Sequence, residues 1–112
     1  MDLVLDELRE LADGDEEAFG VLLGAYLTAA EALTGEIAAA IAGADPAAAR
    51  LSAHALKGSA GQFGVLAVMR AAHAVEMAAA KGDLAQTAAH FEELRDAHER
   101  ASNQLRTAKL VE

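Results

Sequence analysis

Cysteine and tryptophan are absent from this chain, proline occurs once, and the aromatic side chains are one tyrosine and three phenylalanines. Without cysteine there can be neither a disulfide framework nor a thiolate metal site. With so few aromatics, a core must be built mainly from Leu, Val, Ile and Ala. The single proline, the absence of an alternating β-branched run and the many strong helix formers predict an all-α fold.

Long apolar runs and a basic leader are also missing. No apolar stretch approaches the length expected of a bilayer-spanning helix, and the first seven residues are acidic where a signal peptide would be basic. We therefore expect a cytoplasmic protein with no membrane partner.

Carboxylates are unevenly distributed. The net charge is −9, which argues against nucleic acid and anionic membranes as partners. Between Pro46 and Val75, however, there is no Asp or Glu, whereas Arg50, Lys57 and Arg70 are present. This segment could therefore accommodate an acidic partner surface or a negatively charged adduct.

Apolar residues recur at helical spacing along nearly the whole chain of 112 residues, which is long enough for one domain (1–112). We predict a short N-terminal helix at about 2–12 and a four-helix bundle at about 15–107. Short connections predict antiparallel neighbours, in an up-down bundle with the N-terminal helix as a lid. The long helices are expected between Asp15 and Gly43, from Pro46 to 61–64, from about Val65 to Lys81, and from Leu84 to about 107.

A single stripe of the second long helix carries His54, Lys57, Gly58 and Gly61, at helical spacings of three, four and seven. Each interior glycine costs about 1 kcal/mol relative to alanine. A lone helical histidine is usually a surface residue without a special role, but that interpretation leaves the glycines and the nearby cation unexplained. A nucleophilic imidazole needs an open approach and a cation for the transferred charge, so His54 is the candidate reactive group.

Glu76 falls on the apolar face of the next helix, among residues such as Met69 and Val75. A carboxylate there is costly unless it is paired. The imidazole N–H of His54 would satisfy it and leave the other ring nitrogen as the nucleophile. The alternatives are pairing with His73, Arg70 or a lysine, or exposure to solvent.

Other chemistries find little support. The chain has no Walker-type loop, no GxGxxG after a strand and no GxSxG, so it has no visible means of binding ATP. His54 and His73 are too isolated to suggest zinc, and we expect no metal site. His98 lies on the inward stripe of the last helix and fits a satisfied core or boundary position.

The segment Ala53-His54-Ala55-Leu56-Lys57-Gly58-Ser59-Ala60, with Phe63-Gly64, resembles the signature of histidine-containing phosphotransfer (HPt) domains. These are the four-helix-bundle carriers of multistep two-component phosphorelays, and the resemblance extends over most of the chain.

The resemblance implies a role for each residue of the motif. His54 would be phosphorylated, Lys57 would neutralise the phosphoryl group, and Gly58 would give a receiver domain room to dock. Glu76 falls where many members place a Gln or Glu that hydrogen-bonds the histidine. His73 with Glu76 also resembles the hydrogen-bonded pair in the phosphotransfer domain of the chemotaxis histidine kinase.

The docking surface implied for a receiver comprises Arg50, Gly58, Gly61 and Gln62. Gln62 and Phe63 replace the commoner Asn and Leu. Ala80 stands where many fungal and plant members carry an additional basic residue, for which Arg50 or Lys81 could substitute.

The function implied is the relay of a phosphoryl group between aspartates of receiver domains, by a covalent carrier rather than an enzyme. The expected partners are response-regulator receiver domains and a hybrid histidine kinase. No cofactor is expected on the chain, because Mg²⁺ would be held by the receiver, and we expect a monomer. The alternatives are a phosphotransfer domain of a chemotaxis-type or hybrid kinase, or a receiver-docking module that accepts no phosphate.

Overall fold

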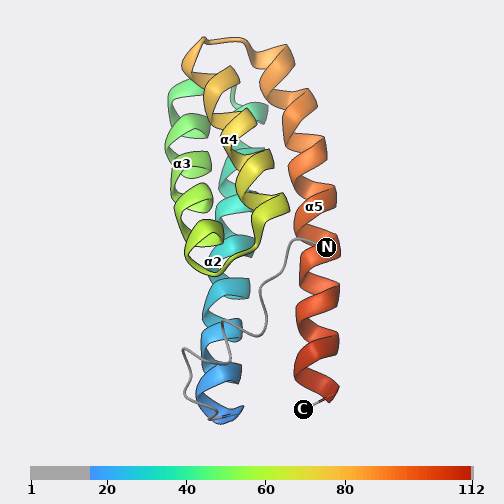
Figure 1. Ribbon diagram of the computed structural model, residues 1–112. Helices are drawn as coiled ribbons and strands as arrows, with labels where there is room; N and C mark the ends of the chain where they lie inside the picture. The colour runs from blue at the N-terminus through green and yellow to red at the C-terminus, as the bar shows by residue number, and fades with distance from the viewer. Residues whose placement is uncertain (1–15, 112) are drawn as a thin grey trace.

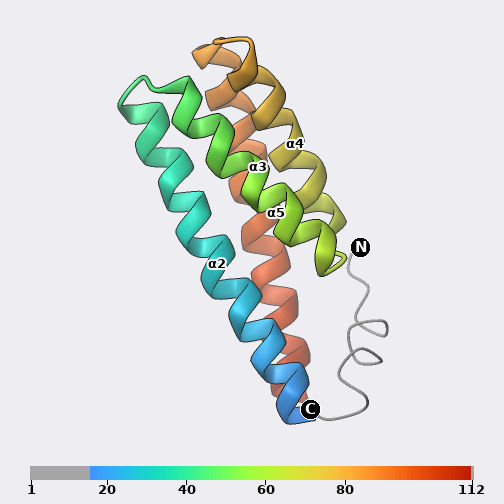
Figure 2. The same cartoon turned by 90° about the vertical axis from the view of Figure 1, so that its left-hand side faces the viewer.

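The computed structural model describes residues 16–111, and this part of the chain contains four α-helices and no β-strand. Successive helices run antiparallel in an up-and-down bundle (Figures 1 and 2). The predicted all-α four-helix bundle is confirmed, whereas the lid helix expected at about 2–12 lies outside the described residues. The helices are α2 (Glu16–Ala42), α3 (Pro46–Gln62), α4 (Leu66–Ala80) and α5 (Leu84–Val111).

The starts of α3 and α5 follow the capping rules. The Asp45 side chain accepts a hydrogen bond of 3.1 Å from the Ala48 amide, and Pro46 occupies the first turn. Asp83 caps α5 in the same way, since its Oδ1 atom accepts a 3.0 Å hydrogen bond from the Gln86 amide. At its other end α5 continues to Val111, beyond the 107 expected from its apolar pattern.

Each turn between helices contains one residue in the left-handed conformation. These residues are Ala44 (φ 54°), Gly64 (φ 72°) and Gly82 (φ 72°). The amide after each of them donates to a carbonyl near the end of the preceding helix, which is the usual way to close a helix on a left-handed residue. The acceptors are the carbonyls of Ala40, Ala60 and Ala78, at 2.8, 2.8 and 3.2 Å. In the first turn, therefore, alanine takes the conformation that glycine adopts in the other two.

Buried aliphatic residues from all four helices form the core. The contribution of α3 is small in volume, because three of its four buried residues are alanines: Ala49, Ala53, Leu56 and Ala60. Larger side chains from the other helices fill the space that these leave. The main ones are Leu23, Tyr26, Ile37, Val68, Val75, Phe91, Leu94 and Leu105.

The helices differ in length, and this divides the bundle along its axis. α2 and α5 have 27 and 28 residues, whereas α3 and α4 have 17 and 15. All four helices lie together at one end, and α2 and α5 extend beyond the other two at the opposite end (Figures 1 and 2). The residues of interest on α3 and α4 therefore belong to the four-helix end.

α2 contains a longer apolar stretch than the sequence analysis predicted. The stretch Gly20–Ala42 of α2 has a mean hydropathy of 1.2. Judged by length and composition alone, it could cross a membrane. The expectation that no stretch reaches this length is therefore corrected. The buried face of the same helix supplies Leu23, Tyr26 and Ile37 to the core, which explains part of its apolar character.

Candidate functional site

The position of His54 follows from the buried stripe of α3. Ala53 and Leu56 are fully buried against the core, so the intervening His54 turns outward. Its side chain is 64% exposed. The imidazole is therefore accessible to a partner while its backbone is fixed by the packing of its neighbours.

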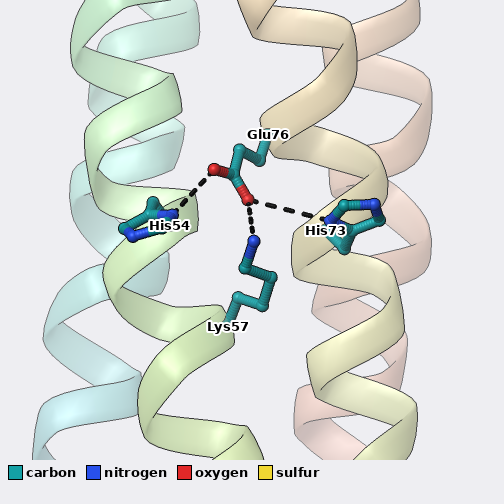
Figure 3. A network of polar contacts seen from close by, with 4 residues as sticks. All are labelled: His54, Lys57, His73 and Glu76. Carbon is teal, nitrogen blue, oxygen red and sulfur yellow. Dashed lines mark hydrogen bonds and ion pairs between the residues drawn. The ribbon is translucent and has the colours of Figure 1, made fainter.

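Glu76 comes from α4 and is 93% buried. Its two oxygens contact different side chains of α3 (Figure 3). Oε2 lies 2.7 Å from Nδ1 of His54, and Oε1 lies 2.6 Å from Nζ of Lys57. Of the partners weighed for Glu76, the structure thus brings His54 and a lysine to it together. Both contacts bridge the seam between α3 and α4.

The charge of Glu76 determines the protonation pattern of the site. The Lys57 ammonium holds the pKa of Glu76 below its usual 4.5, and the hydrogen bond with His54 acts in the same direction. Burial acts against them and raises the pKa, but the carboxylate remains ionised at neutral pH. An ionised carboxylate can only accept, so Nδ1 of His54 carries the hydrogen and donates it. In the neutral imidazole, the free lone pair is then on Nε2.

His73 lies one helical turn before Glu76 on α4. Its Nδ1 atom is 3.8 Å from Oε1 of Glu76, the oxygen that Lys57 also contacts, and its side chain is 55% exposed. This distance is too long for a hydrogen bond, so His73 is at the edge of the network (Figure 3). Arg70, a further turn away, is exposed.

The two glycines of the stripe have different surroundings. A Cβ atom at Gly58 would meet nothing within 4 Å, so helix packing does not require glycine there. At Gly61 a Cβ atom would lie 3.2 Å from Sδ of Met69, so this glycine allows α4 to approach α3. Packing therefore accounts for the glycine at position 61. At position 58 glycine lowers helix stability relative to alanine, and no packing contact requires it. A role of Gly61 in docking stays a prediction.

Arg50 and Gln62 are exposed on α3, Arg50 one turn before His54 and Gln62 two turns after it. The sequence analysis missed Leu51, which is 62% exposed and lies three residues before His54. Its spacing from His54 was a signal that could have identified it. The surface around the imidazole thus combines an exposed leucine, an arginine and a bare glycine.

His98 lies in a different part of the bundle. Its side chain is 7% exposed, and Nε2 contacts Oε2 of Glu31 on α2 at 2.8 Å. The core position expected for His98 is confirmed, but only Nε2 is satisfied, because Nδ1 is buried with no hydrogen-bond partner among the described residues. Among the described residues, no group of three histidine or carboxylate side chains is arranged to hold a metal ion.

Comparisons with known proteins place this geometry in context. The family model described as "Hpt domain" matches residues 21–104. The fold is similar to the crystal structure of histidine-containing phosphotransfer protein B (HptB) from Pseudomonas aeruginosa PAO1, with a TM-score of 0.89 and 22% sequence identity. That match covers 99% of this chain and 96% of the other. No curated protein matches this chain in sequence.

Proposed function

Because this chain belongs to the Hpt domain family, whose members act in two-component signalling as phosphocarriers rather than enzymes, we propose that His54 relays a phosphoryl group between receiver-domain aspartates. The observation that carries the proposal is the 2.7 Å contact between Nδ1 of His54 and Oε2 of Glu76. In the neutral ring this contact assigns the hydrogen to Nδ1 and the lone pair to Nε2, on a side chain that is 64% exposed.

The transfer step follows from this arrangement. Nε2 attacks the phosphorus of an aspartyl phosphate in line, the Nε2–P bond forms, and the P–O bond to the aspartate breaks. The aspartate leaves as a carboxylate, while the imidazole acquires positive charge and keeps its Nδ1 proton. Glu76 stabilises that charge through the existing hydrogen bond. Reversal of the step on another receiver regenerates neutral His54.

Lys57 supplies the positive charge that the phosphoryl group needs. It is one turn beyond His54 on α3, and its side chain is 28% exposed, so its ammonium can move from Glu76 to a group on Nε2. No carboxylate occurs between Pro46 and Val75 to repel the incoming phosphate. In this proposal the chain needs no cofactor, and Mg²⁺ belongs to the receiver.

The docking surface proposed for the receiver is the face of α3 that carries Arg50, Leu51, Gly58 and Gln62. Leu51 offers apolar contact, and the bare surface at Gly58 allows a partner to come close to His54. The partners proposed are receiver domains and a hybrid kinase, with the carrier acting as a cytoplasmic monomer.

Phosphotransfer from a prephosphorylated receiver tests the proposal. The parent protein should take up label that is acid-labile and alkali-stable, as expected of phosphohistidine, and the His54→Gln variant should take up none. His90→Gln is the matched control, because it removes another histidine, on α5, whose contact is with Glu93 and not with Glu76. Failure to label the parent with a broad panel of receivers would favour a docking module that accepts no phosphate.

A second candidate is a phosphotransfer domain that an ATP-binding kinase domain phosphorylates directly. The observation that favours it is His73 at the edge of the Glu76 network, the pair that resembles the chemotaxis kinase. Incubation with ATP and a panel of histidine-kinase catalytic domains separates the two. Labelling by these domains, without any transfer from receivers, would favour the kinase-linked role.

A further inference from the structure

Glu76 must be paired in every state of the site, because it is 93% buried. In the state described by the structure, Lys57 contacts Oε1 at 2.6 Å and His54 contacts Oε2 at 2.7 Å. The structure also places Nδ1 of His73 at 3.8 Å from Oε1. Two groups on different helices therefore compete for the same oxygen.

Phosphorylation changes the balance of charge. If His54 accepts a phosphoryl group, as proposed above, the phosphoryl oxygens bring about 1.5 to 2 negative charges, against one positive charge on the ring and one ammonium on Lys57. Lys57 is then attracted outward to the phosphoryl oxygens. Its departure leaves Oε1 of Glu76 buried without a donor, which is unfavourable for a buried carboxylate oxygen, while Oε2 keeps its contact with Nδ1 of His54.

We propose that His73 is a positioning residue that replaces Lys57 as the counter-charge of Glu76 while His54 carries a phosphoryl group. The inference rests on the proposed function. In the exchange, His73 takes a proton from solvent and becomes an imidazolium. It then moves about 1 Å closer and donates its Nδ1–H to Oε1. Lys57 is thereby free to remain on the phosphoryl group.

The surroundings of His73 suit this exchange. From α3 it faces Lys57 and His54, and on its own helix Arg70 and Glu76 are each one turn away. On the α5 side of α4, Glu93, Asp96 and Arg100 line a groove with Arg70, Ala71 and Ala74, and His73 is not part of that groove. With 55% of its side chain exposed, His73 is accessible to solvent.

The first test does not require phosphorylation. Lys57→Met removes the ammonium from Oε1, and imidazole NMR then follows the titration of His73. The midpoint should move up by roughly half a pH unit or more, since the cation is lost and the carboxylate is freed. His90 is the internal control, because its Nδ1 is 3.6 Å from Oε1 of Glu93 in the same i, i+3 arrangement on another helix. An unchanged midpoint at His73 would overturn the inference.

The second test uses the phosphorylated protein. In the parent, the midpoint of His73 should rise when His54 is phosphorylated, and the rate of transfer back to a receiver should depend on pH near neutrality. His73→Gln should lose that part of the pH profile, and His73→Lys should restore the rate without the pH dependence. A pH profile in His73→Gln identical to the parent would contradict the exchange.

The two tests separate the possible failures. If His54 accepts no phosphate, the proposed function fails, and the Lys57→Met titration still decides whether His73 and Lys57 compete for Glu76. If His54 is phosphorylated but the midpoint of His73 is the same in both states, the proposed function stands and the exchange is wrong.

Discussion

The Nδ1 atom of His54 on α3 and the Oε2 atom of Glu76 on α4 lie 2.7 Å apart, although the two residues are 22 positions apart in the sequence. The histidine is mostly exposed and the carboxylate is mostly buried. The buried partner therefore fixes the ring from beneath, and the opposite ring nitrogen is presented to solvent.

Replacement of Glu76 should slow phosphotransfer without unfolding the bundle. In Glu76→Ala the ring loses the acceptor that fixes its orientation and tautomer, and misplacement of a reacting atom by about 1 Å can cost about a hundredfold in rate. Glu76→Gln keeps an acceptor for Nδ1–H and should lose less. Single-turnover transfer from a phosphorylated receiver measures the rates, and circular dichroism checks the fold. Equal rates in Glu76→Ala and the parent would remove the orienting role.

Substitution of Gly58 should raise stability and weaken docking together. A side chain there meets open space, so Gly58→Ala should stabilise the helix by about 1 kcal/mol. Gly58→Leu should keep part of this gain and weaken receiver binding, because the bulky side chain occupies the approach to His54. Thermal unfolding and titration calorimetry give the two quantities.

The matched control for Gly58 is Gly35→Ala in α2, where a Cβ atom also meets nothing within 4 Å. That variant should gain similar stability with receiver affinity unchanged. Undiminished binding by Gly58→Leu would show that the bare surface has no part in docking.

The lowered pKa of Glu76 predicts a loss of stability in acid. A carboxyl whose pKa is lower in the folded than in the unfolded chain contributes stability above the unfolded value of about 4.5, and loses it as the pH falls through the folded value. The stability difference between the parent and Glu76→Gln should thus shrink as the pH falls below about 4.5. Urea unfolding at a series of pH values measures it. A difference that stays constant down to pH 3 would show that the pKa of Glu76 is not lowered by folding.

The left-handed turns predict a pair of opposite stability effects. Ala44 has a φ of 54°, which costs an alanine about 1 kcal/mol or more, so Ala44→Gly should stabilise the protein despite the extra freedom of glycine in the unfolded chain. Gly82→Ala places a side chain on a residue with φ of 72° and should destabilise it by about 1 kcal/mol. Urea unfolding of both variants tests the pair. Two shifts of the same sign would be inconsistent with this account.

Much of the fold could be predicted from the sequence because its signals are local. Asp45-Pro46 marks a helix start through capping and a fixed φ, and Gly82 marks a helix end. The same reasoning predicted that the long first helix of the bundle stops at Gly43, and α2 ends at Ala42. Gly43 follows the last helical residue, but the left-handed position falls on Ala44, and local propensity gives no warning that an alanine will accept it.

The part of the candidate site that lies on one face of α3 could be predicted from the sequence. The spacing of His54, Lys57 and Gly58 follows from helix geometry, and the apolar neighbours of Glu76 revealed that it needed a partner. The sharing of Oε1 between Lys57 and His73 depends on the register of α4 against α3, which no periodicity specifies. The packing role of Gly61 against Met69 depends on the same register.

The alanines on the inner face of α3 have a consequence for motion. Ala49, Ala53 and Ala60 have no rotamers to freeze, so α3 packs against the core with little loss of side-chain entropy and little freedom to repack. The mobility left to the imidazole is rotation about its own χ1 and χ2, which the carboxylate beneath it restrains. The ring that we propose to react is therefore pre-organised when the bundle folds, and an arriving partner need not order it.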